Sequence, residues 1–244
     1  MQRHDQYFFL DRDCIKRVIK TFKPTGKVLE IGGGRGAITQ ELVSDKKKID
    51  VVEIDRTLSF LLNQKFEGKV NVINKDVMDV TFNGYSSIVG NIPFSLSSPI
   101  LFKFLASDAK KALFWLQREF AEKMVASPSD ENFGRLSVMV QARSDVKIVE
   151  NVSRFAFVPV PETDASVVLL KKKEKFTVDA VLVNALFQHK NQNVKNALMH
   201  STSTLKKTKE ELREMLDKVP LELREKRVYC LTFNEIEEVS KKLA

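Results

Sequence analysis

The stretch Lys27-Val-Leu-Glu-Ile-Gly-Gly-Gly-Arg-Gly-Ala-Ile-Thr-Gln-Glu-Leu-Val43 decides the fold of this 244-residue chain. Its first five residues have the apolar pattern of a buried parallel strand, and Ala37–Val43 has a helical pattern. The glycines of Gly32–Gly36 lie between them, where they let the backbone approach a ligand at a helix N-terminus. This order of strand, glycine loop and helix predicts an α/β domain that binds a nucleoside or nucleotide.

The same alternation continues downstream of the glycine loop. Helices are expected at Asp55–Phe66 and Ser97–Ala106. Further strands are expected at Ile49–Ile54, Val70–Ile73, Ser86–Gly90, Ala112–Leu116 and Ser166–Leu170. Because strands and helices alternate, the sequence predicts a right-handed, doubly wound parallel sheet.

A charge run at Lys171–Lys175 marks a change in the pattern, since the chain after it is predicted to be all helical. We therefore expect a ligand-binding domain at 1–172 and a small helical domain at 173–244. The net charge of the chain is +8. Residues 1–170 carry 24 basic and 21 acidic groups, whereas residues 171–244 carry 16 and 11. Residues 171–244 thus carry +5 of the net charge of +8, which favours an anionic partner such as nucleic acid.

Several classes of protein are disfavoured by composition. No apolar run approaches the roughly 18 residues that span a bilayer, and Met1–Asp5 lacks the apolar segment of a signal peptide. Cys14 and Cys230 lie far apart without a CxxC pair, so neither a metal site nor a disulfide is expected. The prediction is a cytoplasmic protein without a metal or a membrane partner.

Acidic residues lie at or just after the ends of two of the predicted strands. Glu53 lies about 20 residues after the glycine loop, where a ribose-binding acid is expected. Asp76 follows the next strand and can accept a hydrogen bond from an adenine amine. The carboxyl ends of parallel strands share one edge of a sheet, so these residues predict an adenosine-containing cofactor. An NAD-dependent oxidoreductase and an S-adenosylmethionine-dependent methyltransferase both fit this pattern.

The fourth strand ends in Asn91-Ile92-Pro93-Phe94. The Asn91 side chain and the Ile92 backbone offer two carbonyl oxygens, Pro93 stiffens the loop, and the Phe94 ring offers a flat apolar face. Two acceptors beside an aromatic ring suit the exocyclic amine of a planar base. An ordinary turn is the alternative when the tetrapeptide is taken alone. A hydride-transfer enzyme would not require this tetrapeptide, but an enzyme that methylates an amino group would.

These motifs resemble the ribosomal RNA adenine dimethyltransferase family in order and spacing over nearly the whole chain. The segments that carry the resemblance are Glu30–Gly36, Glu53–Asp55, Asp76, Asn91–Phe94, Phe133–Ser137 and Phe157–Pro161. Ser97–Ile100, Glu119–Met124 and Phe187–Asn191 are similar to the archaeal members. The resemblance implies a Rossmann-like S-adenosylmethionine-dependent methyltransferase fold with a small C-terminal helical domain. It implies N6,N6-dimethylation of two adjacent adenosines near the 3′ end of small-subunit rRNA, as a step of ribosome biogenesis.

The resemblance also implies roles for individual residues. The catalytic residues would be Asn91, Ile92, Pro93 and Phe94, and Phe94 and Phe157 would stack on the target base. The cofactor S-adenosyl-L-methionine would be bound by Tyr7, Phe9, Gly32, Gly34, Glu53, Ile54, Asp76, Val77 and Asn91. This chain departs from the family at Tyr7, where asparagine or histidine is usual, and at Phe94, where tyrosine is commoner.

The implied partner is small-subunit rRNA within an assembling 30S-type subunit, bound by a monomer. The residues expected to contact RNA are Arg135, Arg143, Lys190, Lys195, Lys206, Lys207 and Lys209. Two further alternatives remain open besides the NAD enzyme. One is a non-catalytic ribosome-assembly or RNA-binding factor that keeps the fold, and the other is the antibiotic-resistance branch that modifies large-subunit rRNA.

Overall fold

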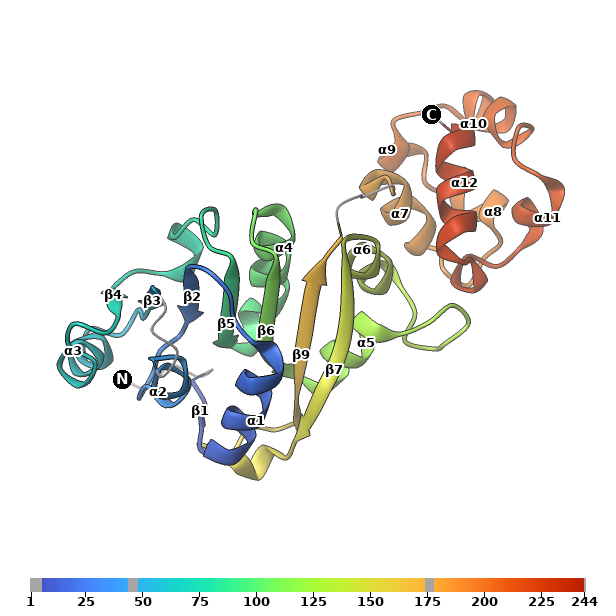
Figure 1. The fold of residues 1–244 in the computed structure, drawn as a ribbon. Helices are drawn as coiled ribbons and strands as arrows, with labels where there is room; N and C mark the ends of the chain where they lie inside the picture. Colours follow the sequence, from blue (N-terminus) through green and yellow to red (C-terminus); the bar gives the residue numbers. More distant parts are fainter. Residues whose placement is uncertain (1–5, 44–47, 174–177, 244) are drawn as a thin grey trace. The chain divides into compact units, whose positions relative to one another are not determined.

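A computed structural model describes residues 6–43, 48–173 and 178–243 of the chain. Contacts divide the chain into two compact units (Figure 1). The first unit comprises residues 1–121 and 146–172, and the second comprises 122–145 and 173–244. Segment 122–145 therefore folds with the later helices. The predicted functional division into 1–172 and 173–244 stays a prediction, and its boundary run Lys171–Lys175 is described only up to Lys173.

The first unit is built on a seven-stranded sheet of order β4-β3-β2-β5-β6-β9-β7. Its strands are β2 (Val28–Ile31), β3 (Ile49–Val52), β4 (Asn71–Ile73), β5 (Ser87–Asn91), β6 (Lys111–Gln117), β7 (Ser144–Val152) and β9 (Ala165–Lys172). The first five strands in the sheet order are parallel, whereas β9 pairs antiparallel with β6. The sheet is therefore mixed rather than wholly parallel. The segment between β7 and β9 contains no crossover helix, so the chain returns in the opposite direction (Figure 1).

Helices cover both faces of this sheet. The helices are α1 (Arg12–Phe22), α2 (Ala37–Leu42), α3 (Arg56–Lys65) and α4 (Ser97–Ala106). Ile15 of α1, Ile38 of α2 and Leu62 of α3 are buried in one apolar core with Trp115 of β6. Successive side chains of a strand point to opposite faces of a sheet. Phe114, the residue before Trp115 on β6, accordingly packs on the other face, edge-on against Phe104 of α4 with 6.0 Å between ring centroids. Because both faces of the sheet are buried, its strands are continuous apolar runs in the sequence.

A second, two-stranded sheet joins segments that are far apart in the sequence. In it, β1 (Phe8–Phe9) pairs antiparallel with β8 (Phe157–Val158). The Phe9 ring is buried against the rings of Phe157 and Trp115, with centroids 4.9 and 5.8 Å apart. The aromatic residues near the start of the chain thus pack on the loop that precedes β9. This pairing brings both segments to the carboxyl edge of the large sheet.

The second unit is helical. Its elements are the second half of α5 (Arg118–Val125), then α6 (Arg135–Arg143), α7 (Ala180–Phe187), α8 (Val194–Met199), α9 (Thr202–Leu205), α10 (Lys209–Leu216), α11 (Leu221–Glu225), η5 (Val228–Cys230) and α12 (Phe233–Leu243). The ring of Phe133 is buried between Phe187 and Phe233, at centroid distances of 5.6 and 6.2 Å. The segment before α6 is therefore part of the apolar core of the second unit, although it precedes the charge run at Lys171–Lys175 in sequence.

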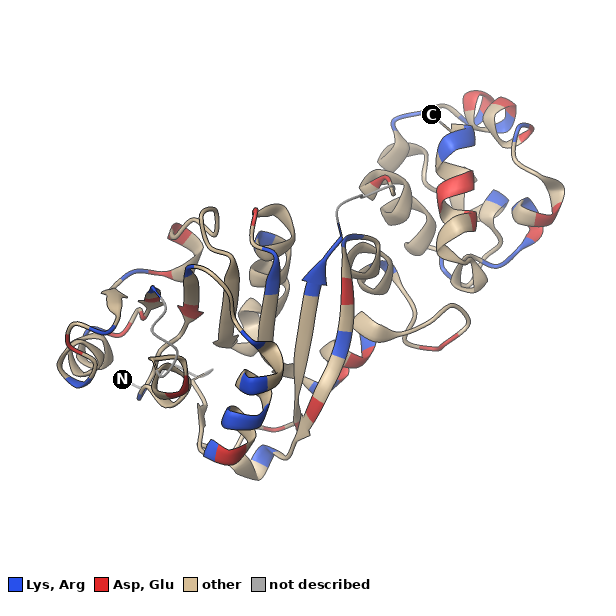
Figure 2. Ribbon diagram, viewed as in Figure 1, with Lys and Arg blue, Asp and Glu red and all other residues tan. Residues whose placement is uncertain are grey.

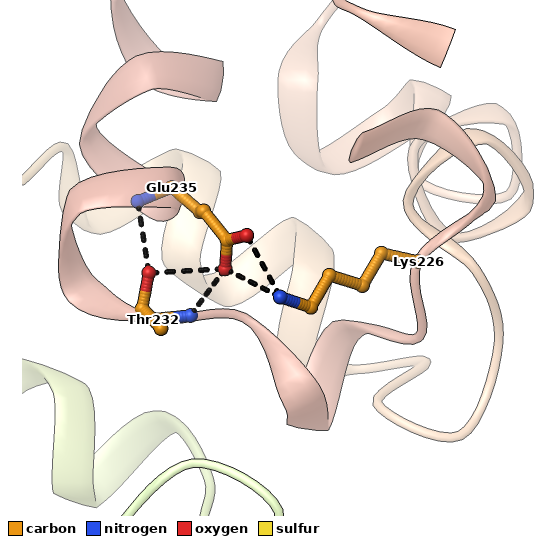
Figure 3. Close-up of polar contacts among 3 residues, drawn as sticks. All are labelled: Lys226, Thr232 and Glu235. Atoms are coloured by element: carbon orange, nitrogen blue, oxygen red, sulfur yellow. Dashed lines mark hydrogen bonds and ion pairs between the residues drawn. The ribbon is translucent and has the colours of Figure 1, made fainter. Parts of the chain in front are cut away.

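The start of α12 is fixed by Glu235 (Figure 3). Its carboxylate accepts hydrogen bonds from the Thr232 amide at 2.8 Å and from the Lys226 ammonium at 2.7 Å, while the Glu235 amide donates to the Thr232 hydroxyl at 3.3 Å. Partial burial acts to raise the pKa of Glu235, but the hydrogen bonds from Lys226 and Thr232 hold it below its ordinary value. Thr-x-x-Glu here is a capping box that defines where the last helix begins.

Within the described ranges, no helix is long and apolar enough to cross a bilayer. The same ranges contain no group of three or more His, Cys, Asp or Glu side chains arranged to hold a metal ion. Cys14 is buried and Cys230 is half-buried, and neither forms a disulfide.

Candidate functional site

A cavity of about 220 Å³ lies at the carboxyl ends of β2, β3 and β5 in the first unit. This is the edge at which open α/β sheets bind ligands. Its walls come from the N-terminal segment, the glycine loop, the ends of three strands and the turns η2 (Val77–Asp79) and η3 (Phe94–Leu96). Nearly all of the predicted cofactor and catalytic residues line it: Tyr7, Gly32, Gly34, Glu53, Ile54, Asp76, Val77, Asn91, Ile92, Pro93, Phe94 and Phe157.

The glycine loop forms the floor where β2 ends. Gly32 and Gly34 have φ angles of +69° and +52°, in the left-handed region that L side chains rarely adopt. A β-carbon on Gly34 would lie 3.4 Å from the Phe8 ring, and one on Gly32 would lie 3.7 Å from the Asn91 carbonyl. The loop therefore runs close to both the N-terminal segment and β5, and backbone conformation requires glycine at these positions.

Glu53 ties this loop to the end of β3. One carboxylate oxygen accepts from the Gly34 amide and the other from the Asp55 amide, both at 2.9 Å. The side chain is buried, yet it lines the cavity. Each carboxylate oxygen has more than one acceptor site, so Glu53 can hold the loop and still accept from ribose hydroxyls. The sequence predicted the ribose role but carried no sign of the contact with Gly34.

Asp76 lies at the start of η2, after β4. It accepts from the Met78 amide at 2.9 Å, and this bond begins the turn. Lys103 of α4 donates from its ammonium to the carbonyls of Val77 and Met78, at 3.1 and 2.5 Å. The turn that follows Asp76 is therefore also held by a lysine of α4. Sequence analysis missed Lys103, because its position on a helix carries no motif.

Asn91 is the last residue of β5, and its amide group is fixed. The Asn91 amide nitrogen donates to the Tyr7 carbonyl at 2.7 Å, which leaves the side-chain oxygen as an acceptor. The Ile92 amide donates to the Trp115 carbonyl at 3.2 Å, and the Pro93 carbonyl accepts from Leu96 at 2.8 Å. The tetrapeptide is thus anchored at both ends. Tyr7 contributes to this through its backbone, so its departure from the family pattern leaves this contact intact.

The predicted aromatic residues occupy different surroundings. The Phe94 ring lines the cavity and packs on Tyr7, with centroids 5.5 Å apart and planes at 36°. Phe157 also lines the cavity, although packing on Phe9 and its neighbours leaves it almost completely buried. Phe9 itself lies behind Phe157 in the core and does not line the cavity, so a contact between its side chain and a cofactor stays a prediction.

Glu30 lies on β2, two residues before the glycine loop, and is buried. Neither carboxyl oxygen has a hydrogen-bond partner among the described residues, although Thr39 of α2 lies beside it. Burial raises the pKa of Glu30 from 4.5 to about 8, a shift that nearby Thr39 opposes. At neutral pH the folded protein therefore holds this side chain mainly in its uncharged form.

All seven cations predicted to contact RNA belong to the second unit, including Arg135 and Arg143 at the two ends of α6. Lysines and arginines of that unit are interspersed with acidic residues (Figure 2). Lys195, Lys206 and Lys209 are exposed, and Lys207 is half-buried. Lys190 has a structural role, because its ammonium donates to the carbonyls of Glu131 and Phe133, at 2.8 and 3.3 Å.

The cavity fits an adenosyl cofactor. The positive-φ glycines allow close backbone approach, Glu53 presents acceptor oxygens at the end of β3, and Asp76 presents one beyond β4. Asn91 lines the same cavity from the end of β5, followed by Pro93 and Phe94. A planar base that entered between Asn91 and Phe94 would therefore meet a cofactor bound along the strand ends.

Comparison with known proteins agrees with this geometry. The family described as ribosomal RNA adenine dimethylase matches residues 2–238. A Pyrococcus furiosus protein named probable ribosomal RNA small subunit methyltransferase A is 37% identical over 243 residues, covering 96% of this chain and 88% of its own. A Methanococcus vannielii protein of the same name is 36% identical, covering 96% and 93%.

Two solved structures resemble the fold over nearly its full length. A dimethyladenosine transferase from Plasmodium falciparum has a TM-score of 0.82 and 27% identity, covering 96% of this chain and 98% of its own. The 23S rRNA methyltransferase ErmE has a TM-score of 0.70 and 25% identity, covering 95% and 98%. Both similarities include the first unit and the helical second unit.

Proposed function

This chain belongs to the ribosomal RNA adenine dimethylase family, and from that premise we propose that it dimethylates adenosines of small-subunit rRNA with S-adenosylmethionine as methyl donor. The product is N6,N6-dimethyladenosine at two adjacent adenosines near the 3′ end. One observation carries the assignment to amine chemistry: the Tyr7 carbonyl holds the Asn91 amide so that its oxygen remains an acceptor beside Phe94.

The chain's own residues hold and orient the amine. An adenine amine is a poor nucleophile because its lone pair is delocalised into the ring. The Asn91 side-chain oxygen and the Ile92 carbonyl can accept its two hydrogens, which favours a pyramidal nitrogen with a directed lone pair. When bound, S-adenosylmethionine would supply an electrophilic methyl group on its sulfonium; the sulfur–methyl bond would break as the nitrogen–methyl bond forms, S-adenosylhomocysteine would leave, and the amine's displaced proton would pass to solvent. The rate acceleration then comes from positioning and fixed dipoles rather than from a strong base.

The target base has to leave its stack to reach this position. Phe94 offers one apolar face at the cavity, and Phe157 contributes to the wall from β8. The Phe157 ring packs against Phe9, which holds it in place as part of this wall. We assign base stacking to Phe94 and Phe157 on this ground.

We further propose that the second unit docks the enzyme on RNA in an assembling 30S-type subunit in the cytoplasm. The support is the exposure of Arg135, Lys195, Lys206 and Lys209 on one compact unit. The relatives' names refer to the small subunit, whereas ErmE is named for 23S rRNA. We propose that the enzyme acts as a monomer.

Labelled-methyl transfer tests the proposal. Purified protein is incubated with labelled S-adenosylmethionine and small subunits that lack the modification, with large subunits as the control. We expect label in small-subunit rRNA alone, located at two adjacent adenosines. Label in large-subunit rRNA would assign the chain to the antibiotic-resistance branch. No label in either, despite binding to small subunits, would favour a non-catalytic assembly factor.

A further inference from the structure

An exposed aromatic residue lies two positions before a residue of the cavity wall. Phe155 is 72% exposed, the largest exposure among the large apolar side chains of the described residues. It belongs to the turn η4 (Arg154–Ala156), which leads directly into β8. Phe157, two residues later, lines the cavity, and two residues of chain span at most about 7 Å. The exposed ring is therefore within the reach of a nucleotide that neighbours one bound in the cavity.

The backbone around Phe155 is fixed, so its exposure does not reflect a loose loop. The Arg154 amide donates to the Asp164 carboxylate at 3.0 Å. The Ala156 amide donates to the Ser153 carbonyl at 2.9 Å, and the Ala156 carbonyl accepts from the Leu10 amide at 2.9 Å. The turn is thus tied on one side to the segment before β9 and on the other to the end of β1. A rigidly presented ring loses little conformational entropy when it binds a partner.

A cation lies over this ring. The Arg154 guanidinium carbon is 5.2 Å from the Phe155 ring centroid. One guanidinium nitrogen donates to the Glu162 carbonyl at 3.0 Å, which fixes the group in place. Guanidinium has five N–H donors, so others remain for a phosphate or a base edge. The ring and the cation together form a preformed aromatic–cationic pair on the surface.

We propose that Phe155 and Arg154 form a stacking site for the unpaired RNA nucleotide next to the adenosine held in the cavity. The base would stack on the Phe155 ring, and Arg154 would contact the adjoining phosphate. Stacking on aromatic rings beside cationic side chains is how proteins bind single-stranded nucleic acid. This inference rests on the proposed function, since it names how the same substrate is held outside the cavity. Two stacking sites would keep the flipped adenosine and its neighbour apart.

Four variants of the full-length protein test this site. Phe155→Ala removes the ring, Phe155→Trp keeps a ring that stacks, and Phe155→Leu keeps apolar bulk without one. Phe60→Ala is the matched control, because Phe60 is also an exposed phenylalanine of the first unit, at 60%. For each, we would measure affinity for unmodified small subunits, affinity for S-adenosylmethionine, and the methyl-transfer rate.

We expect Phe155→Ala and Phe155→Leu to bind small subunits roughly five- to hundredfold more weakly, the range for loss of one base–aromatic stack. Phe155→Trp and Phe60→Ala should bind like the parent, and all should bind S-adenosylmethionine equally. Parent-like affinity of Phe155→Ala would overturn the proposal. If Phe155→Leu kept the affinity that Phe155→Ala loses, the ring would be an apolar contact for a ribosomal protein, which would also overturn it. The binding measurement judges this site independently, whereas absence of methyl transfer by the parent would instead refute the proposed function.

Discussion

The side-chain amide of Asn91 is evident from the sequence, but its orientation is set by the Tyr7 carbonyl, 84 residues away in the chain. The asparagine side chain predicted one of the two acceptors, the other being the Ile92 carbonyl, and the location at a strand end predicted a ligand site. The hydrogen bond to the Tyr7 carbonyl could not be predicted, because every residue has a backbone carbonyl and the residue type does not indicate which one accepts. The hydrogen bond from the Gly34 amide to Glu53 was not predicted either, since it also involves a backbone group. Residue types thus indicate chemistry, while backbone partners decide geometry.

Glu30 leads to a prediction at the residue scale. Its pKa in the folded protein is about 8, above the ordinary value of 4.5, because burial disfavours the charged form. A raised pKa stabilises the folded state fully at low pH, and that contribution is lost as the pH rises from about 4.5 through 8. For one proton the slope is at most about 1.4 kcal/mol per pH unit. Glu30→Gln cannot ionise, so its free energy of unfolding should fall less between pH 6 and pH 9 than that of the parent.

Urea denaturation at several pH values would check this. Glu67→Gln is the control, since Glu67 is exposed in the same unit. Parallel pH dependences for Glu30→Gln and the parent would mean that the buried carboxyl does not titrate in this window.

At the scale of elements, the turn η2 is held by a lysine of the helix α4. Lys103 of α4 donates to two carbonyls of the turn that carries Asp76. Lys103→Met should therefore raise the KM for S-adenosylmethionine several-fold while kcat stays close to the parent value, because Lys103 positions Asp76 and does not line the cavity. Steady-state kinetics with varied cofactor would measure this split.

Lys16→Met on α1 is the control for Lys103→Met, since it removes an exposed lysine from the same unit. An unchanged KM in Lys103→Met would show that η2 holds its shape without the lysine. A fall in kcat alone would instead place Lys103 near the reacting groups.

Elements with local signals were predicted well from the sequence. The helix predicted at Ser97–Ala106 agrees with α4 to the residue. The antiparallel position of β9 was not predicted, because strand direction depends on the connection rather than on the strand's own residues. The β1–β8 pair was also missed, since two-residue strands separated by about 150 positions carry no periodic pattern.

At the scale of the whole protein, affinity for RNA should depend on the second unit. Replacing Lys206, Lys207 and Lys209 together with glutamine should make the salt dependence of subunit binding shallower, by roughly one unit of slope for each phosphate that is no longer neutralised. Filter binding at several salt concentrations would measure the slope. Lys190→Met offers a contrast, because its removal frees two carbonyls and should lower thermal stability. An unchanged salt dependence in the triple variant would show that Lys206, Lys207 and Lys209 do not contact RNA phosphates.

Asn91 is the residue on which the proposed chemistry depends, because the proposal assigns it to hold the amine that is methylated. Single-turnover methyl transfer by the parent and by Asn91→Ala would test this role, with saturating S-adenosylmethionine and unmodified small subunits. Asn91→Ala removes one preorganised acceptor and leaves the second unit untouched, so the rate should fall by roughly 10²–10³-fold while subunit affinity stays within about twofold of the parent. Methyl transfer by Asn91→Ala at the parent rate would show that Asn91 does not hold the amine.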